Sequence, residues 1–158
     1  MANTQSMCTS FMGELLTATH NFGTAPTRAS SAADTFRGAL YLASATINAS
    51  TTAYSTTGEV TGTGYSAGGV VVTNATPPTA TNASSTAGVA YWTPSASLTY
   101  TSVTLTTAFD AVLIYNASQS NKAVSVHTFG SQTITAGTFT LTMPVNSTTT
   151  ALLRLATT

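Results

Sequence analysis

The sequence predicts an all-β protein, an antiparallel β-sandwich or jelly roll of about eight strands with a short N-terminal helix or arm. Three observations support this prediction. Thr and Ser make up about a third of the 158 residues, and β-branched Thr suits a pleated strand. Many short segments alternate between apolar and polar residues. Turn-forming residues separate these segments at intervals of about 8 to 12 residues, a spacing typical of antiparallel sandwiches.

The first 33 residues differ from the rest, and we predict that they form a helix or arm followed by a linker. A helix of about ten residues is indicated by apolar and polar side chains near helical spacing, at Phe11, Leu15, Leu16 and Thr19. The residues that follow, up to Ala33, are rich in Ala, Ser, Thr, Gly and Pro, which is typical of an exposed connection. We therefore divide the chain into residues 1–33 and a β-sandwich domain at residues 34–158.

The predicted strands all lie in the second part. Alternation or short apolar runs place them at residues 35–42, 70–73, 89–92, 98–105, 111–115, 123–129, 139–143 and 152–155. The segments at 43–69 and 74–88 are predicted to be irregular because they are rich in Gly, Pro, Asn and Ser, and residues 116–121 are predicted to form a turn.

Charge is scarce, which excludes several classes of partner. Only 5% of the residues are charged and the formal net charge is zero, whereas soluble domains carry about 25%. Without a basic cluster we expect no nucleic-acid partner, because Lys and Arg neutralise phosphates. No apolar run approaches the length of a membrane span, so we expect no membrane partner. The N-terminus has no basic segment or apolar run, so we expect synthesis in the cytosol without secretion.

The predicted strands also lack the charges that usually protect sheet edges. The chain has a single lysine, Lys122. Soluble β-proteins commonly blunt their edges with Lys, inward-pointing charges or Pro. We therefore expect a homo-oligomer, a dimer or trimer, or a component docked in a larger assembly.

No catalytic, cofactor or metal site is predicted. Two His and the single Cys8 form no recognised metal-ligand spacing. No G-x-S-x-G nucleophile motif occurs. His127 lies in an alternating strand, where a hydrogen-bonded structural role is favoured. Hydrolysis by a pair formed from His127 and Asp110 is kept as a third, enzymatic hypothesis.

Aromatic residues leave one alternative open. Tyr91, Trp92 and Tyr100 could form a platform that stacks on a sugar, but Tyr and Trp are equally common at protein interfaces. The alternative function is therefore a receptor- or carbohydrate-binding module.

Several segments of the chain form a recognisable pattern when they are taken together. They are Ala39-Leu40-Tyr41, the run from Tyr54 to Gly69, and the blocks at 111–116, 121–124, 129–131 and 139–144. In their order and spacing, these segments resemble a family of small virion structural proteins of tailed bacteriophages. The resemblance covers most of residues 34–155.

The resemblance implies a capsid decoration, or cement, protein that binds the outer surface of the major capsid protein lattice and stabilises the head. The expected location is the virion, on the capsid exterior. For the alternative receptor- or carbohydrate-binding module, the resemblance implies a position at the phage collar or tail. Residues 1–33 are then a candidate arm toward a neighbouring subunit, and the glycine-rich segment at 57–69 is a second candidate contact. The predicted interface residues are Phe11, Leu15, Leu16, Gly58, Gly62, Gly64, Tyr65, Tyr91 and Trp92.

Overall fold

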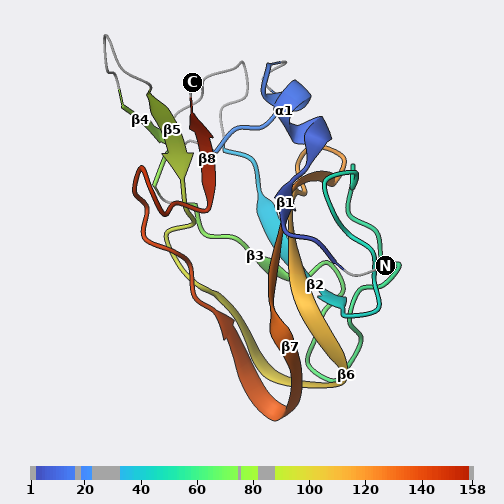
Figure 1. Cartoon of the computed structure of the whole chain (residues 1–158). Coiled ribbons are helices and arrows are strands. Elements are labelled where there is room, and N and C mark those ends of the chain that lie inside the picture. Colours follow the sequence, from blue (N-terminus) through green and yellow to red (C-terminus); the bar gives the residue numbers. More distant parts are fainter. Residues whose placement is uncertain (1–2, 17–18, 23–32, 75, 82–87, 157–158) are drawn as a thin grey trace.

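The protein folds into two antiparallel sheets, as Figure 1 shows for the computed structural model, which describes residues 3–16, 19–22, 33–74, 76–81 and 88–156. One sheet has the strand order β1-β7-β6-β2-β3 and the other has β4-β5-β8. The elements are β1 (Ser6–Met7), α1 (Thr9–Leu16), β2 (Phe36–Leu42), β3 (Val70–Val71), β4 (Thr79–Ala80), β5 (Val89–Trp92), β6 (Leu98–Asn116), β7 (Lys122–Leu141) and β8 (Leu153–Ala156). The predicted all-β sandwich of about eight strands is confirmed.

Strands β6 and β7 form a long hairpin, which contains the most extensive strand pairing of the fold. The sequence predicts two separate strands in each of these segments, and this is wrong. No Gly or Pro interrupts residues 98–116, so β6 continues through, and shifts in the β6–β7 register mark bulges that absorb the extra residues. Figure 1 shows this ribbon bending sharply at its lower end. The predicted turn connects the strands at residues 117–121.

The described part of the N-terminal segment packs onto the domain. Strand β1 pairs with β7 through Ser6↔Val126 and Met7↔Ser125. The side chains of Cys8, Phe11 and Phe22 are buried in the same core cluster as the strands. Residues 3–16 and 19–22 therefore pack on the sandwich, and α1 lies in the segment where a helix of about ten residues was predicted. Of the predicted linker, residues 23–32 lie outside the described residues.

The segment at residues 43–69 has no strand, as predicted. Isolated backbone bridges attach it to the sheets, at Tyr41↔Glu59, Ala53↔Lys122 and Thr63↔Thr104. The second segment predicted to be irregular contains β4, because residues 79–80 find partners in β5. Residues 75 and 82–87 of that segment lie outside the described residues.

Candidate functional site

The apolar interface residues predicted from the sequence divide into buried and partly accessible side chains. Phe11 and Trp92 are each 2% exposed, so both belong to the core and neither is available to a partner. Leu15 and Tyr91 are half-buried and line a cavity between α1 and the three-stranded sheet. The side chain of Leu16 lies outside the described residues.

The aromatic platform for a sugar is not formed. Trp92 and Tyr100 are 2% and 3% exposed. The Nε1 of Trp92 donates to the Thr76 carbonyl at 3.1 Å, and the Tyr100 hydroxyl donates to the Gly38 carbonyl at 2.8 Å. Both polar groups are thus satisfied inside the protein, which is how buried Trp and Tyr are usually accommodated. The hypothesis of a stacking surface made by Tyr91, Trp92 and Tyr100 is wrong.

The predicted interface glycines make close contacts within the chain. A Cβ on Gly62 would overlap the carbonyl oxygen of Thr104, and a Cβ on Gly64 would overlap that of Ser102. The backbone therefore lies directly against β6, and the Thr104 N–H donates to the Thr63 carbonyl at 2.9 Å. The inner face of this segment is occupied by the protein itself, while its outer face is exposed.

A buried carboxylate holds this glycine-rich segment in place. Glu59 is 5% exposed. It accepts hydrogen bonds from the Tyr54 hydroxyl at 2.6 Å, the Tyr65 hydroxyl at 2.7 Å and the Gly68 N–H at 2.7 Å. Burial, together with the hydrogen bond to Glu59, raises the pKa of Tyr54 and of Tyr65. Tyr65, a predicted interface residue, is therefore a hydrogen-bond donor inside the protein. Glu59 was not predicted from the sequence to be the acceptor.

A second buried polar network joins the N-terminal segment to the start of the β6–β7 turn. His20 Nε2 lies 2.7 Å from Glu14 Oε2, and Asn116 Nδ2 donates to His20 Nδ1 at 3.1 Å and to Asp34 Oδ2 at 2.8 Å. Because the Asn116 amide nitrogen only donates, His20 Nδ1 accepts and Nε2 carries the proton. Burial lowers the pKa of His20, in keeping with a neutral ring. Lys122 pairs with the same carboxylate, 2.6 Å from Glu14 Oε1.

The pair required by the enzymatic hypothesis is not assembled. Asp110 Oδ1 accepts a hydrogen bond from Asn3 Nδ2 at 2.6 Å, and no ion pair joins Asp110 to His127 in the described residues. His127 Nε2 instead lies 2.8 Å from Ser125 Oγ. Ser125 is 1% exposed, so its hydroxyl is enclosed. Burial lowers the pKa of His127 to about 4.

The free energy of unfolding is expected to fall as the pH drops below about 6.5. An unfolded His has a pKa of about 6.5, while folded His127 has a pKa of about 4. Between these values the unfolded chain binds an additional proton, so acid favours unfolding. The expected loss from His127 is about 2 kcal/mol between pH 7 and pH 4.5, measured by urea unfolding.

The control for this prediction is His127→Gln, which keeps a hydrogen-bonding side chain beside Ser125 but does not titrate. This variant is expected to lose less stability over the same pH range. It should retain the smaller dependence due to His20, whose pKa is also lowered by burial. Equal pH slopes for the variant and the wild type would contradict the assignment to His127.

A groove runs along β8, formed by two cavities that share Met7 and Leu153. The first, of about 90 Å³, lies between α1 and the three-stranded sheet, and its lining is almost entirely apolar. The second, of about 320 Å³, lies between β8 and the strands β1 and β7. Its lining mixes polar and apolar groups and includes His127 and Arg154. The groove is the strongest candidate site, because accessible apolar and polar groups converge there beside a sheet edge.

In the part of the chain that the structure describes, no three His, Cys, Asp or Glu side chains are grouped so that they could hold a metal ion. The same residues include no helix of the length and hydrophobicity needed to cross a membrane. Comparisons with protein-family models, curated proteins and solved structures found no match to this chain.

Proposed function

We propose that this protein is a structural component of a tailed-bacteriophage virion, a capsid decoration protein that docks on the outer surface of the major capsid protein lattice and stabilises the head. The observation that carries the docking role is the composition of the sheet edges. Among the described residues, β1, β3, β4 and β8 lie at the edges of the two sheets, and only Arg154 in these strands is charged.

Two edge strands also present large apolar side chains to solvent. Val71 in β3 is 56% exposed and Leu155 in β8 is 42% exposed. An edge strand offers unpaired backbone groups to another chain, and apolar side chains on it add surface that association would bury. These features support assembly on a protein surface over binding of a charged or small polar ligand.

The specific assignment to phage capsids is supported by the resemblance of residues 34–155 to small virion proteins. A protein that binds only the assembled shell stabilises it by mass action, because each bound copy adds its binding free energy to the assembled state. The partners in this proposal are the major capsid protein and further copies of the same chain.

Binding to purified mature heads tests the proposal. The wild-type protein is expected to sediment with the heads and to raise the temperature at which they open. Val71→Lys combined with Leu155→Lys is expected to weaken binding at least about ten-fold, because each Lys places a charge on an edge strand. The unfolding temperature of the free variant should stay close to that of the wild type.

The matched control is Val145→Lys. Val145 is 75% exposed but lies outside the strands, so this variant should bind heads like the wild type. Undiminished binding by the double variant would overturn the edge-docking role. Electron microscopy of the particles tests the location, since density over the head lattice supports decoration and density only at the portal vertex supports the collar or tail alternative.

A further inference from the structure

The outer edge of β8 offers backbone hydrogen-bonding groups. In β5, the Val89 carbonyl accepts from the Thr81 N–H at 3.0 Å, and the Val89 N–H donates to Thr81 Oγ1 at 2.9 Å, so Val89 faces β4. Neighbouring residues of an antiparallel strand direct these groups to opposite sides. Ala90 therefore faces β8, where it pairs with Leu155.

The same alternation determines which groups of β8 are unpaired. Leu153 and Leu155 direct their N–H and C=O groups to β5. Those of Arg154 and Ala156 consequently point to the open edge. In the strand order β4-β5-β8, no further strand of the described residues lies on that edge.

The groove along β8 leaves open space beside the strand. Its apolar cavity lies beside Leu153 and Leu155, and its larger cavity, of about 320 Å³, separates β8 from β1 and β7. Strand addition obtains affinity from the backbone and specificity from pockets that take alternate side chains. The unpaired backbone groups lie on the open edge of β8, and the apolar cavity lies on the face of the same strand that is directed toward α1.

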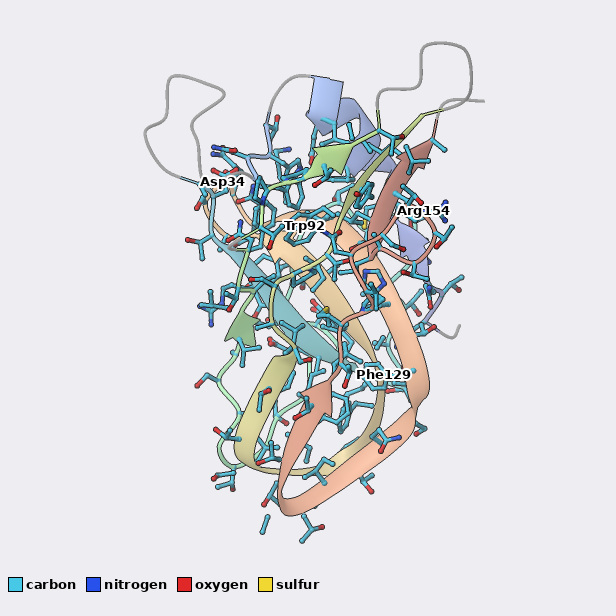
Figure 2. The ribbon with its side chains drawn as sticks, turned by 90° about the vertical axis from the view of Figure 1, so that its left-hand side faces the viewer. Asp34, Trp92, Phe129 and Arg154 are labelled. Atoms are coloured by element: carbon cyan, nitrogen blue, oxygen red, sulfur yellow. The ribbon has the colours of Figure 1, made fainter. Side chains whose placement is uncertain are left out.

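The charge of Arg154 indicates a second feature of a segment that would bind in the groove. The Arg154 Nε donates to the Thr148 carbonyl at 2.7 Å, and among the described residues Arg154 has no ion pair with an acidic side chain. Figure 2 shows Arg154 on the opposite side of the ribbon from Asp34. A guanidinium without an acidic neighbour favours a carboxylate on the partner, because charge-assisted hydrogen bonds are the stronger ones.

We propose that this groove binds an extended segment of a partner protein as an added strand on β8, with an acidic residue opposite Arg154 and aliphatic residues opposite Leu153 and Leu155. Side chains directly opposite each other lie on the same face of a sheet. The recognised pattern is therefore aliphatic-acidic-aliphatic within an otherwise uncharged segment. This inference rests on the proposed docking function and names the chemistry of the segment that docks.

Binding of fluorescent peptides tests the groove without any capsid. The probe is the extended peptide Thr-Thr-Val-Glu-Val-Thr-Thr with blocked ends, and its partner probe has Gln in place of Glu. By fluorescence anisotropy the wild-type protein is expected to bind the Glu peptide about ten-fold more tightly than the Gln peptide.

Two substitutions at one position separate the backbone from the charge. Arg154→Thr removes the guanidinium but keeps the outward N–H, so both peptides should bind equally, at the strength of the Gln peptide on the wild type. Arg154→Pro also removes the N–H, which Pro at an edge does without breaking a bond of its own sheet. This variant should bind both peptides at least about ten-fold more weakly than Arg154→Thr does.

The same comparison can be made at the other outward N–H, with Ala156→Pro and Ala156→Thr. This second pair replaces the first if Arg154→Pro does not fold. The proposal is overturned if the wild type binds neither peptide, or if the Pro and Thr variants of a folded pair bind equally. These outcomes are distinct from failure of the proposed function. If heads bind the Pro variants normally, the decoration function stands and docking through the groove is ruled out. If the protein binds the peptide but not the heads, strand addition in the groove stands and the decoration function is ruled out.

Discussion

Replacing Glu59 with leucine is expected to lower the free energy of unfolding by about 4 kcal/mol, because the substitution leaves buried donors without an acceptor. Glu59 accepts from two tyrosine hydroxyls and one backbone N–H, all within 2.6–2.7 Å. Leu has a similar size but cannot accept a hydrogen bond. Urea unfolding monitored by circular dichroism measures the loss, and a change below about 1 kcal/mol would contradict this role for Glu59.

The conservative variant Glu59→Gln separates hydrogen bonding from packing. Its amide oxygen still accepts, but its NH₂ group replaces the second acceptor with a donor. The free energy of unfolding is expected to fall by about 2 kcal/mol, less than the fall expected for Glu59→Leu. Tyr54→Phe, which removes only one of the three donors, should cost about 1 kcal/mol.

The class of the fold follows from sequence patterns because those patterns are local. In β2, for example, Phe36 and Leu40 are in the core as the alternation predicts. Ala39 and Tyr41 on the opposite face are buried as well, so this strand is covered on both sides. The predicted break between the strands at 98–105 and 111–115 was wrong, and the absence of Gly and Pro from residues 98–116 is only part of the reason. The connection stays in the sheet because β7 offers partners at both of its ends, where Leu105 pairs with Ile134 and Phe109 pairs with Gln132.

The roles of the candidate site residues depend on distant partners, so most of them could not be predicted. The sequence singles out Trp92 and Tyr100 as aromatic and amphipathic, but their burial is decided by contacts with elements far along the chain. Tyr100, for example, donates to Gly38, which lies 62 positions earlier. The network of His20, Asn116 and Asp34 likewise joins residues that are 82 to 96 positions apart.

One usable signal was present in the sequence and was missed. Glu59 is the single charged residue between residues 38 and 109, and it lies in a glycine-rich segment that bends back on the sheet. A lone acid in such a setting is well placed to accept hydrogen bonds from backbone N–H groups and tyrosine hydroxyls. Arg154 is a comparable signal, because it is the only charged residue in the edge strands of the part that the structure describes.

Gly69→Ala is expected to destabilise the protein by about 4 kcal/mol, because a methyl group at this position meets two independent obstacles. Gly69 has a φ of +69°, in the left-handed region that side chains disfavour. A Cβ would also overlap the carbonyl oxygen of Gly38 in β2. Relief requires the glycine-rich segment to move off the sheet, and Arg37 would then lose its hydrogen bonds to the carbonyls of Gly68 and Gly69.

Gly130→Ala is the matched control, since a Cβ at Gly130 in β7 would meet no atom within 4 Å. Its effect on the free energy of unfolding should stay within about 0.5 kcal/mol, because the added methyl group points into open space and only restricts the unfolded chain. Thermal and urea unfolding of both variants gives the comparison. Equal stability of Gly69→Ala and Gly130→Ala would mean that the segment at residues 57–69 is not held tightly against β2, and the role of Glu59 as its anchor would then lose its basis.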